Sequence, residues 1–429
     1  MSVSSSTVTG HESRAAGPSS EVPRYHLIPR PVFWAVVVLG ILAIGAYLAQ
    51  VLEDPIRQAH QVDLFAYRVA GERVLDGRSL YDTPLIGDTK GVFEFVYSPF
   101  AALVFTPLTA LSGVWFTVAG TLGNFLLLAV VVGLTLGWLG YRRDSRLALF
   151  SVGVAGLLLW CEPIRQSVIF GQVNLILLAL VLVDLMLPDR MRGKGALIGV
   201  AAGIKLIPAF FVLYLLVTRR FRAAAVAGVS FAATVLLGFL LLPKDSVTFW
   251  AGAFLDPTRV GVPEHPGNET LRGMIVRTIG EGGFQQLLWV VLAGAVAVVG
   301  LLLARQLSLH GRELPAVLLC GLVSTAVSPY SWPHHWVWLG LFVVYLLHLS
   351  LRPGAVTARF ALVATVLVTL GGVFAFVDPD VSTLLAIPSW GHLGVFYHNA
   401  YIWLLFAIIA VTARRIHGWT TSQATQFTV

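Results

Sequence analysis

The chain has 429 residues, of which 57% are hydrophobic and only 12% are charged, whereas soluble domains carry about 25% charged residues. A mean hydropathy of +0.80 excludes a soluble globular protein, and apolar runs of roughly 20 residues recur, as a bilayer requires. The net charge of +7 falls in short clusters between these runs, which is typical of cytoplasmic helix ends and disfavours a nucleic-acid partner. The composition therefore predicts an all-α polytopic membrane protein.

The two ends of the chain are polar. Residues 1–30 are rich in Ser and Gly and are expected to be a disordered cytoplasmic tail, and residues 418–429 are expected to be a cytoplasmic tail too. The apolar run after residue 30 lacks a small-residue cleavage site, so we interpret it as a retained helix and not as a signal peptide. Residues 31–417 then form a single transmembrane domain.

The apolar runs predict about twelve transmembrane helices. The run at 195–217 has basic clusters at both ends but is too short for two full spans. Two short helices are therefore expected to meet within it, at Gly203-Ile204-Lys205-Leu206-Ile207-Pro208, because irregular backbone at membrane depth is tolerated where it lines a cavity. The expected spans are 33–52, 97–140, 147–161, 171–187, 195–217, 222–242, 285–304, 313–328, 335–349, 358–377 and 398–413. A re-entrant piece within 97–140 stays an open alternative, because that region contains Pro99, Pro107 and Gly113.

The basic clusters between these runs predict the orientation of the helices. Most Lys and Arg residues gather at alternate helix ends and in the N-terminal tail, while most acids lie at the other ends. Positive residues mark the cytoplasmic side of a membrane protein. We therefore expect a multi-pass protein of the plasma membrane with both termini in the cytoplasm. Three long segments are expected outside: 53–97, 243–284 and 378–397.

The first outer segment contains a helical pattern that opens near Asp63. Apolar residues recur at helical spacing, which predicts an amphipathic helix on the membrane interface. Asp63 is either the N-cap of this helix, because aspartate is a favoured capping residue, or a general base that removes a proton from an acceptor hydroxyl. The local sequence does not separate these interpretations. The apolar stripe consists of Val62, Phe65, Ala66, Val69, Ala70 and Val74.

Two ionisable residues fall outside the expected loops, Lys205 and, near a helix end, Asp184. A charge at membrane depth costs roughly 2.5–3.5 kcal/mol even on the lenient insertion scale. Lys205 lies in the middle of its segment and cannot easily reach the cytoplasmic surface by snorkelling. We therefore interpret it as a counter-charge for an anionic group.

Three further polar segments interrupt the apolar pattern. His334 and His335 follow Ser328-Pro329-Tyr330-Ser331-Trp332-Pro333. Adjacent positions on a helix do not face one another, which disfavours metal binding by this pair. We therefore expect the two histidines to donate hydrogen bonds to phosphate or sugar. An interfacial aromatic belt would explain Trp332, Trp336 and Trp338 without any function. The segments 162–174 and 267–272 are either caps and turns or contacts for sugar hydroxyls.

Taken in chain order, these motifs resemble glycosyltransferase family 87, one of the C-class glycosyltransferases. The resemblance covers about residues 60 to 340, and its motifs are weak singly but specific as an ordered set. They are the segment around Asp63, Leu80-Tyr81-Asp82, Tyr97-Ser98-Pro99-Phe100, Gly171-Gln172-Val173-Asn174, Gly203-Ile204-Lys205-Leu206-Ile207-Pro208, the segment around Asn268, and Ser328-Pro329 with His334-His335.

The resemblance implies a catalytic transmembrane domain with an outward-facing site and a lipid-linked sugar donor. It implies transfer of mannose from polyprenyl-phosphate-mannose to a phosphatidylinositol mannoside, with formation of an α-1,2 link by inversion and with Asp63 as the catalytic base. We expect no metal and no other cofactor, and favour a monomer. Together with the residue patterns it assigns donor-phosphate contacts to Lys205, His334, His335 and Arg165, and sugar or acceptor contacts to Tyr67, Tyr81, Asp82, Tyr97, Gln172, Asn174, Asn268 and Glu269.

Two alternatives stay open. A lipid-linked-sugar flippase or solute transporter would need polar residues along several helices across the full membrane depth, and here they gather toward one face, which favours an enzyme. A related transferase that uses a lipid-linked pentose is compatible with the same motifs.

Overall fold

The computed structural model describes residues 26–89, 93–256, 259–370 and 394–426, which form α-helices and short 3-10 helices without any β-strand. This confirms the all-α class. The helices are α1 (Arg30–Glu53), α2 (Pro55–Gln58), α3 (Val62–Leu75), α4 (Pro99–Phe105), η1 (Thr106–Ala110), α5 (Gly113–Trp138), α6 (Ser145–Leu158), α7 (Glu162–Phe170), α8 (Asn174–Met186), α9 (Ala196–Ile204), η2 (Ile207–Ala209), α10 (Phe210–Val217), α11 (Phe221–Leu241), α12 (Pro243–Ala251), η3 (Ala253–Leu255), α13 (Leu271–Ile279), α14 (Gly283–Leu309), α15 (Glu313–Val327), η5 (Pro333–His335), α16 (Trp338–Ser350), α17 (Val356–Thr369), α18 (Gly394–Tyr397) and α19 (Ala400–Gln426).

Five described helices are long and apolar enough to cross a membrane, namely α1, α5, α11, α14 and α19. A sixth span results if α7 and α8, which meet at a bend of 117°, are taken together. Shorter apolar helices such as α6, α15 and α16 pack among them. The helices coincide with the expected apolar runs, except that 97–140 divides into α4, η1 and α5. The total of twelve spans stays a prediction, and residues 371–393, which include most of the third outer segment, lie outside the described residues.

The run at 195–217 is broken where the sequence predicts it. Helix α9 ends at Ile204, and Lys205 follows in an extended conformation with φ −142° and ψ 131°. The chain then turns through η2, with Pro208 inside it, into α10. The broken backbone places Lys205 between two short helices and not on the face of a continuous one.

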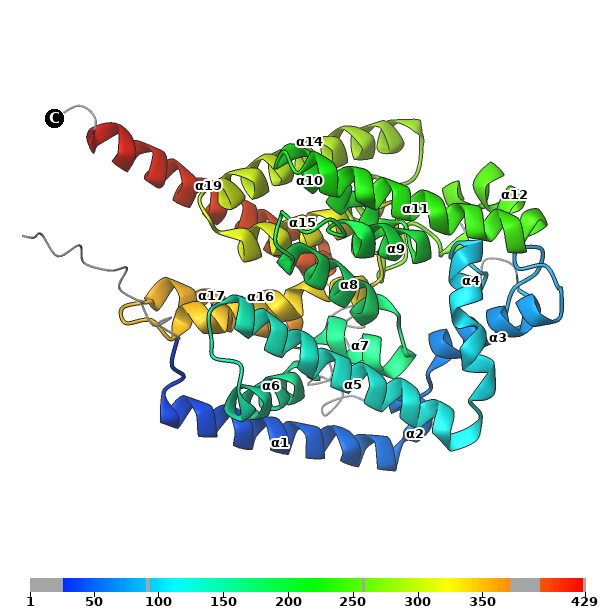
Figure 1. Ribbon diagram of the computed structural model, residues 1–429, viewed down its shortest axis with the longest axis horizontal. Helices are drawn as coiled ribbons and strands as arrows, with labels where there is room; N and C mark the ends of the chain where they lie inside the picture. Colours follow the sequence, from blue (N-terminus) through cyan, green and yellow to red (C-terminus); the bar gives the residue numbers. More distant parts are fainter. Residues whose placement is uncertain (1–25, 90–92, 257–258, 371–393, 427–429) are drawn as a thin grey trace, which may run out of the picture.

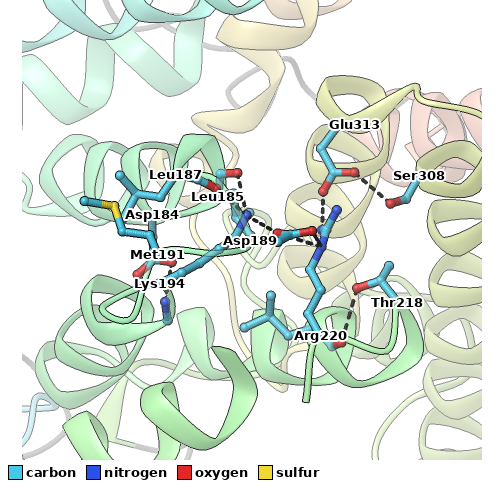
Figure 2. Close-up of polar contacts among 12 residues, drawn as sticks. Asp184, Leu185, Leu187, Asp189, Met191, Lys194, Thr218, Arg220, Ser308 and Glu313 are labelled. Atoms are coloured by element: carbon cyan, nitrogen blue, oxygen red, sulfur yellow. Dashed lines mark hydrogen bonds and ion pairs between the residues drawn. The ribbon is translucent and has the colours of Figure 1, made fainter. Parts of the chain in front are cut away.

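Ion pairs at one end of the bundle join three of the predicted basic turns (Figure 2). Arg220, between α10 and α11, pairs with Asp189 at 3.3 Å and also with Glu313 at the start of α15. Lys194 pairs with the same Asp189 at 2.7 Å. Asp184, the second ionisable residue outside the expected loops, accepts hydrogen bonds from backbone N–H groups at the start of α9. Its carboxylate is therefore accounted for as a helix cap.

Aromatic contacts bring further predicted inner segments together. His26, just before α1, lies 5.2 Å from the ring of His348 near the end of α16. His348 Nδ1 is 3.1 Å from the hydroxyl of Tyr141 in the turn between α5 and α6. In Figure 1 the beginning of α1 and the end of α19 lie at the same end of the bundle, and α2, α3, α4 and α12 lie at the other. The segments predicted to be cytoplasmic therefore share one end.

Helix α3, at the opposite end, confirms the helical pattern of the first outer segment. Ala66, Tyr67 and Ala70 are buried, whereas Phe65 of the predicted stripe is 42% exposed. Helix α3 packs closely on α4 and η1, because a Cβ on Gly71 would lie 2.9 Å from the backbone oxygen of Phe105. This packing fixes α3, and with it Asp63, relative to the spans.

Candidate active site

Asp63 lies in the first turn of α3 and is not its N-cap. The N-cap is Gln61, in a left-handed conformation with φ 51°, and its side chain does not cap the helix; the Nδ1 atom of His60 accepts the hydrogen bond of the Val62 N–H at 3.1 Å. The Asp63 Oδ2 atom instead accepts a hydrogen bond of 2.6 Å from Nε2 of Gln172, which directly precedes the α8 region. The helix-cap interpretation of Asp63 is therefore wrong, and its carboxylate is directed toward another part of the chain.

Two tyrosines hold the amide of Gln172 in place. The hydroxyl of Tyr67 donates to Gln172 Oε1 at 2.8 Å, and the hydroxyl of Tyr97 lies 2.7 Å from that of Tyr67. Because the Oε1 atom accepts these hydrogen bonds, the Nε2 atom is the one that faces Asp63. All three supporting residues were predicted from sequence as sugar or acceptor contacts, and here they orient the carboxylate.

Lys205 lies in a second polar group beside the first. Its Nζ atom donates to Oδ1 of Asn174 at 3.0 Å and lies 2.9 Å from Nε2 of His335. It also lies 5.3 Å from the centre of the Tyr97 ring, which links the two groups. A lysine ammonium can only donate, so Nε2 of His335 is the acceptor and its Nδ1 carries the proton. That Nδ1 is buried and has no hydrogen-bond partner, which leaves a donor available beside the lysine.

His334 contributes to the same corner through its backbone and its ring. Its carbonyl oxygen accepts from Nδ2 of Asn174 at 2.8 Å and from the hydroxyl of Ser167 at 3.3 Å. The ring Nδ1 is buried and unpaired, like that of His335. The junction 328–337 is thereby tied to α7 and α8.

The environment of Asp63 suits a general base. Burial raises the pKa of Asp63 to about 6, and the hydrogen bond from Gln172 and the charge of Lys205 oppose that rise. A carboxylate with a pKa just below neutral pH is ionised and also binds a proton more readily than an ordinary aspartate, which is what proton abstraction requires.

A cavity opens from the Lys205 group into the apolar bundle. Its free volume is about 40 Å³, and polar as well as aliphatic and aromatic side chains line it. This combination of side chains suits an anionic group with an apolar neighbour. The lining residues are Asn174, Leu177, Leu178, Val181, Lys205, Ile207, Pro208, Phe211, Ser324, Thr325, His335, Val337 and Trp338.

Arg165, predicted as a donor-phosphate contact, lies outside this cluster. Its guanidinium donates to the side-chain oxygens of Gln50 and Gln58 and lies about 5 Å from the rings of Tyr47 and Trp160. It joins α7 to the end of α1 and to α2.

Tyr81 and Asp82 occupy the rim of the outer segment. The hydroxyl of Tyr81 donates to the backbone oxygen of Tyr97 at 2.8 Å, so this residue supports the site from behind. Asp82 is exposed, and the hydrogen bonds of Asp63 and Lys205 go to other residues.

Asn268 and Glu269 shape the second outer segment. Asn268 donates to the backbone oxygen of Pro263 at 3.0 Å and accepts from Thr270 at 2.8 Å, which are loop contacts. Glu269 is 3% exposed, and its Oε2 atom has no hydrogen-bond partner. Burial, opposed by the Arg277 charge, raises the pKa of Glu269 well above its usual range. Its carboxyl is free to contact a ligand.

The interfacial-belt interpretation is wrong for two of the three tryptophans near the histidines. Belt residues face lipid, but Trp336 and Trp338 are 0% and 6% exposed. The Nε1 atom of Trp336 donates to the backbone oxygen of Glu269 at 3.1 Å, so Trp336 joins the second outer segment to the histidine junction. Trp332 alone of the three is partly exposed.

The sequence analysis assigned no role to Gln61 or to Ser98, and both support the site. Gln61 Nε2 donates to the backbone oxygen of Val168 at 2.8 Å and so anchors the start of α3 to α7. Ser98 caps α4 and donates to the backbone oxygen of Gly203, two residues before Lys205. The Ser-Pro pair is a recognisable cap signature, but no local pattern reveals the partner of Gln61.

Comparisons with known proteins identify the family of the chain. The family model described as glycosyltransferase family 87 matches residues 95–329, and both Asp63 and the two histidines lie outside that range. The chain is 30% identical to a "polyprenol-phosphate-mannose-dependent alpha-(1-2)-phosphatidylinositol mannoside mannosyltransferase" of Mycobacterium tuberculosis, over 92% of this chain and 93% of the relative.

Two relatives from Mycolicibacterium smegmatis are similar. One has the same descriptive name and is 30% identical over 89% of this chain and 88% of its own length. The other is named for a phosphatidylinositol pentamannoside and is 33% identical over 80% of this chain and 83% of its own length. The fold and the site define a polytopic membrane enzyme whose polar centre lies at one end of an apolar bundle. The chain belongs to glycosyltransferase family 87.

Proposed function

We propose that this glycosyltransferase transfers mannose from polyprenyl-phosphate-mannose to a phosphatidylinositol mannoside and forms an α-1,2 link with inversion. The names of its relatives support the donor and the acceptor class. The observation that carries the proposal is a buried carboxylate, Asp63, that feels the charge of Lys205, while Lys205 itself lines a largely apolar cavity.

The donor phosphate lies against the Lys205 ammonium. Asn174 and His335 fix the position of that ammonium, and the unpaired Nδ1 atom of His335 provides a hydrogen bond. Charge stabilisation is the main requirement for a phosphate leaving group, because the bridging oxygen does not need to be protonated to depart. The isoprenoid tail follows the apolar wall of the cavity.

The reaction needs one base. Asp63 takes the proton of an acceptor hydroxyl as the hydroxyl oxygen attacks the anomeric carbon of the mannose. The bond from that carbon to the phosphate oxygen breaks, and its electron pair leaves with the phosphate toward Lys205. Attack opposite the leaving group converts a β-linked mannosyl phosphate into an α-mannoside.

The active site is proposed to face the extracytoplasmic side of the plasma membrane. The start of α1 at Arg30 and the end of α19, which carries Arg414 and Arg415, lie at one end of the bundle, and α3 lies at the other (Figure 1). The positive-inside tendency therefore supports this orientation. Residues 31–417 constitute the catalytic domain in this proposal, between two cytoplasmic tails.

The test is transfer by detergent-purified protein without any membrane gradient. We expect labelled mannose to move from polyprenyl-phosphate-mannose to a phosphatidylinositol mannoside, and to do so in excess chelator. Donors that carry a pentose serve as the matched comparison. A protein that turns over only the pentose donor refutes the sugar assignment, and one that moves lipid-linked sugar across vesicles without transfer refutes the enzyme assignment.

A further inference from the structure

A row of aromatic rings runs past the active site on its outer side. The rings of His265 and Trp332 are 5.0 Å apart, and those of Trp332 and His334 are 6.4 Å apart and nearly parallel. The row continues from His334 to Phe170 at 5.5 Å and from Phe170 to His60 at 4.9 Å. It joins the second outer segment, the histidine junction, the end of α7 and the start of the first outer segment.

Most of this row is accessible. His265 and His60 are exposed and Trp332 and Phe170 are partly exposed, while His334 is buried between them. The ring of Trp332 rests on the backbone at Gly267, where a Cβ would lie 2.5 Å from the ring. The indole is thus held in a fixed position although it is not part of the core.

Unpaired polar atoms accompany the rings. The Tyr330 hydroxyl, the Glu269 carboxyl and the His334 Nδ1 atom each lack a hydrogen-bond partner, and each belongs to a residue less than 5% exposed. The rings of Tyr330 and His334 lie 5.2 Å and 6.4 Å from that of Trp332, and the backbone N–H of Glu269 donates to the oxygen of Ser331, the residue before Trp332, at 2.9 Å. Buried polar groups in native structures normally have partners, and three unpaired ones on the residues around Trp332 indicate a ligand rich in hydroxyl groups.

We propose that this row binds the sugar head of the acceptor, with the sugar next to the reacting one stacked on Trp332. The inference rests on the proposed function for the acceptor class. A pyranose presents an apolar C–H face, which suits the negative face of an aromatic ring, and an edge of hydroxyl groups, which suits the three unpaired atoms. The row reaches the start of the first outer segment at His60, three residues before Asp63.

The position also separates the acceptor from the donor. Lys205 and the apolar cavity lie on the His335 side of the junction, whereas Trp332 lies toward His265 and the second outer segment. Loss of the indole therefore weakens acceptor binding and leaves donor binding unchanged.

The test compares the variants Trp332→Ala and Trp332→Phe. Trp34→Ala is the matched control, because Trp34 is 58% exposed and lies near the start of α1, away from the row. Soluble alkyl mannosides with one and with two sugars serve as acceptors. An aromatic stacking contact contributes about 0.5–1.5 kcal/mol, so Trp332→Ala should raise KM for the two-sugar acceptor by up to about tenfold. KM for the one-sugar acceptor and for the donor should not change, and Trp332→Phe should recover most of the loss.

Direct binding of the two-sugar mannoside, measured by saturation-transfer NMR without donor, separates this inference from the proposed function. Wild-type protein that binds the mannoside but transfers no mannose refutes the proposed function alone. Equal binding by wild type and folded Trp332→Ala, or no binding by wild type, overturns the inference. If Trp332→Ala fails to fold, His265→Ala at the exposed end of the row takes its place and should weaken binding in the same assay.

Discussion

Replacing Asp63 by asparagine separates catalysis from structure. The asparagine keeps the size of the side chain, and its Oδ1 atom accepts the hydrogen bond that Gln172 Nε2 now donates at 2.6 Å. The variant cannot accept a proton from the acceptor hydroxyl, and loss of a general base typically lowers the rate by about 10²–10⁴-fold. We expect a loss of that size in kcat for mannose transfer.

The same substitution should stabilise the protein. Burial raises the pKa of Asp63 from 3.8 to about 6, and this difference corresponds to about 3 kcal/mol as an upper limit. Because the folded state holds the proton more tightly than the unfolded state, the stability of the wild type falls as pH rises from about 4 to about 6. The advantage of Asp63→Asn should therefore be greatest above about pH 6 and disappear below about pH 4.

Unfolding in detergent at several pH values and kinetics on the same preparations measure both effects. The kcat/KM of the wild type should fall about tenfold per pH unit below about pH 6, as the base becomes protonated. The reasoning is refuted by a variant that is less stable than the wild type at neutral pH and keeps most of its activity, since that combination indicates a structural carboxylate.

Three further predictions concern the surroundings of the site. Lys205→Met should raise the donor KM strongly, and Lys205→Arg should not restore it, because a planar guanidinium does not replace a compact ammonium; recovery by arginine contradicts the point-charge contact. The side chains of Arg78 and Arg142 are 58% and 74% exposed. In intact cells, a single cysteine in place of Arg78 should react with an impermeant reagent, and one in place of Arg142 should not. The reverse pattern would contradict the proposed orientation. Gly203→Ala should lower activity, because its Cβ would lie 2.6 Å from that of Thr234 and displace the break before Lys205; Thr234→Gly in the same chain should recover part of the loss, and the absence of recovery assigns the defect elsewhere.

The helices could be predicted from sequence because a membrane span satisfies its own backbone hydrogen bonds and needs a continuous apolar run. The same rule located the break at Lys205, where Gly203 and Pro208 interrupt such a run. Within 97–140 it was insufficient, since α4, η1 and α5 are all apolar and their division depends on packing against α3 and α11.

Individual partners were harder to predict than the site as a whole. Asp63 was assigned to the correct helix, but the sequence did not show that Gln61, and not Asp63, is the N-cap. The left-handed backbone of Gln61 is fixed by contacts with α7, more than 100 residues away. Arg165 was grouped with the phosphate contacts on chemistry alone. Its side chain instead meets Gln50 and Gln58, and no local pattern encodes that long-range contact.

Three of the polar residues that converge share one property that sequence does display: each lies at an interruption of a helix. Gln172 lies in the bend between α7 and α8, Lys205 between α9 and η2, and His335 at the end of η5 before α16. Irregular backbone in an apolar bundle is stable only where it is buried in protein or lines a cavity, so such interruptions tend to meet around a shared polar centre. The interruptions therefore predict which side chains can reach a substrate, while the long-range contacts of α3, through Gln61 and Gly71, decide that Asp63 is the carboxylate brought to them.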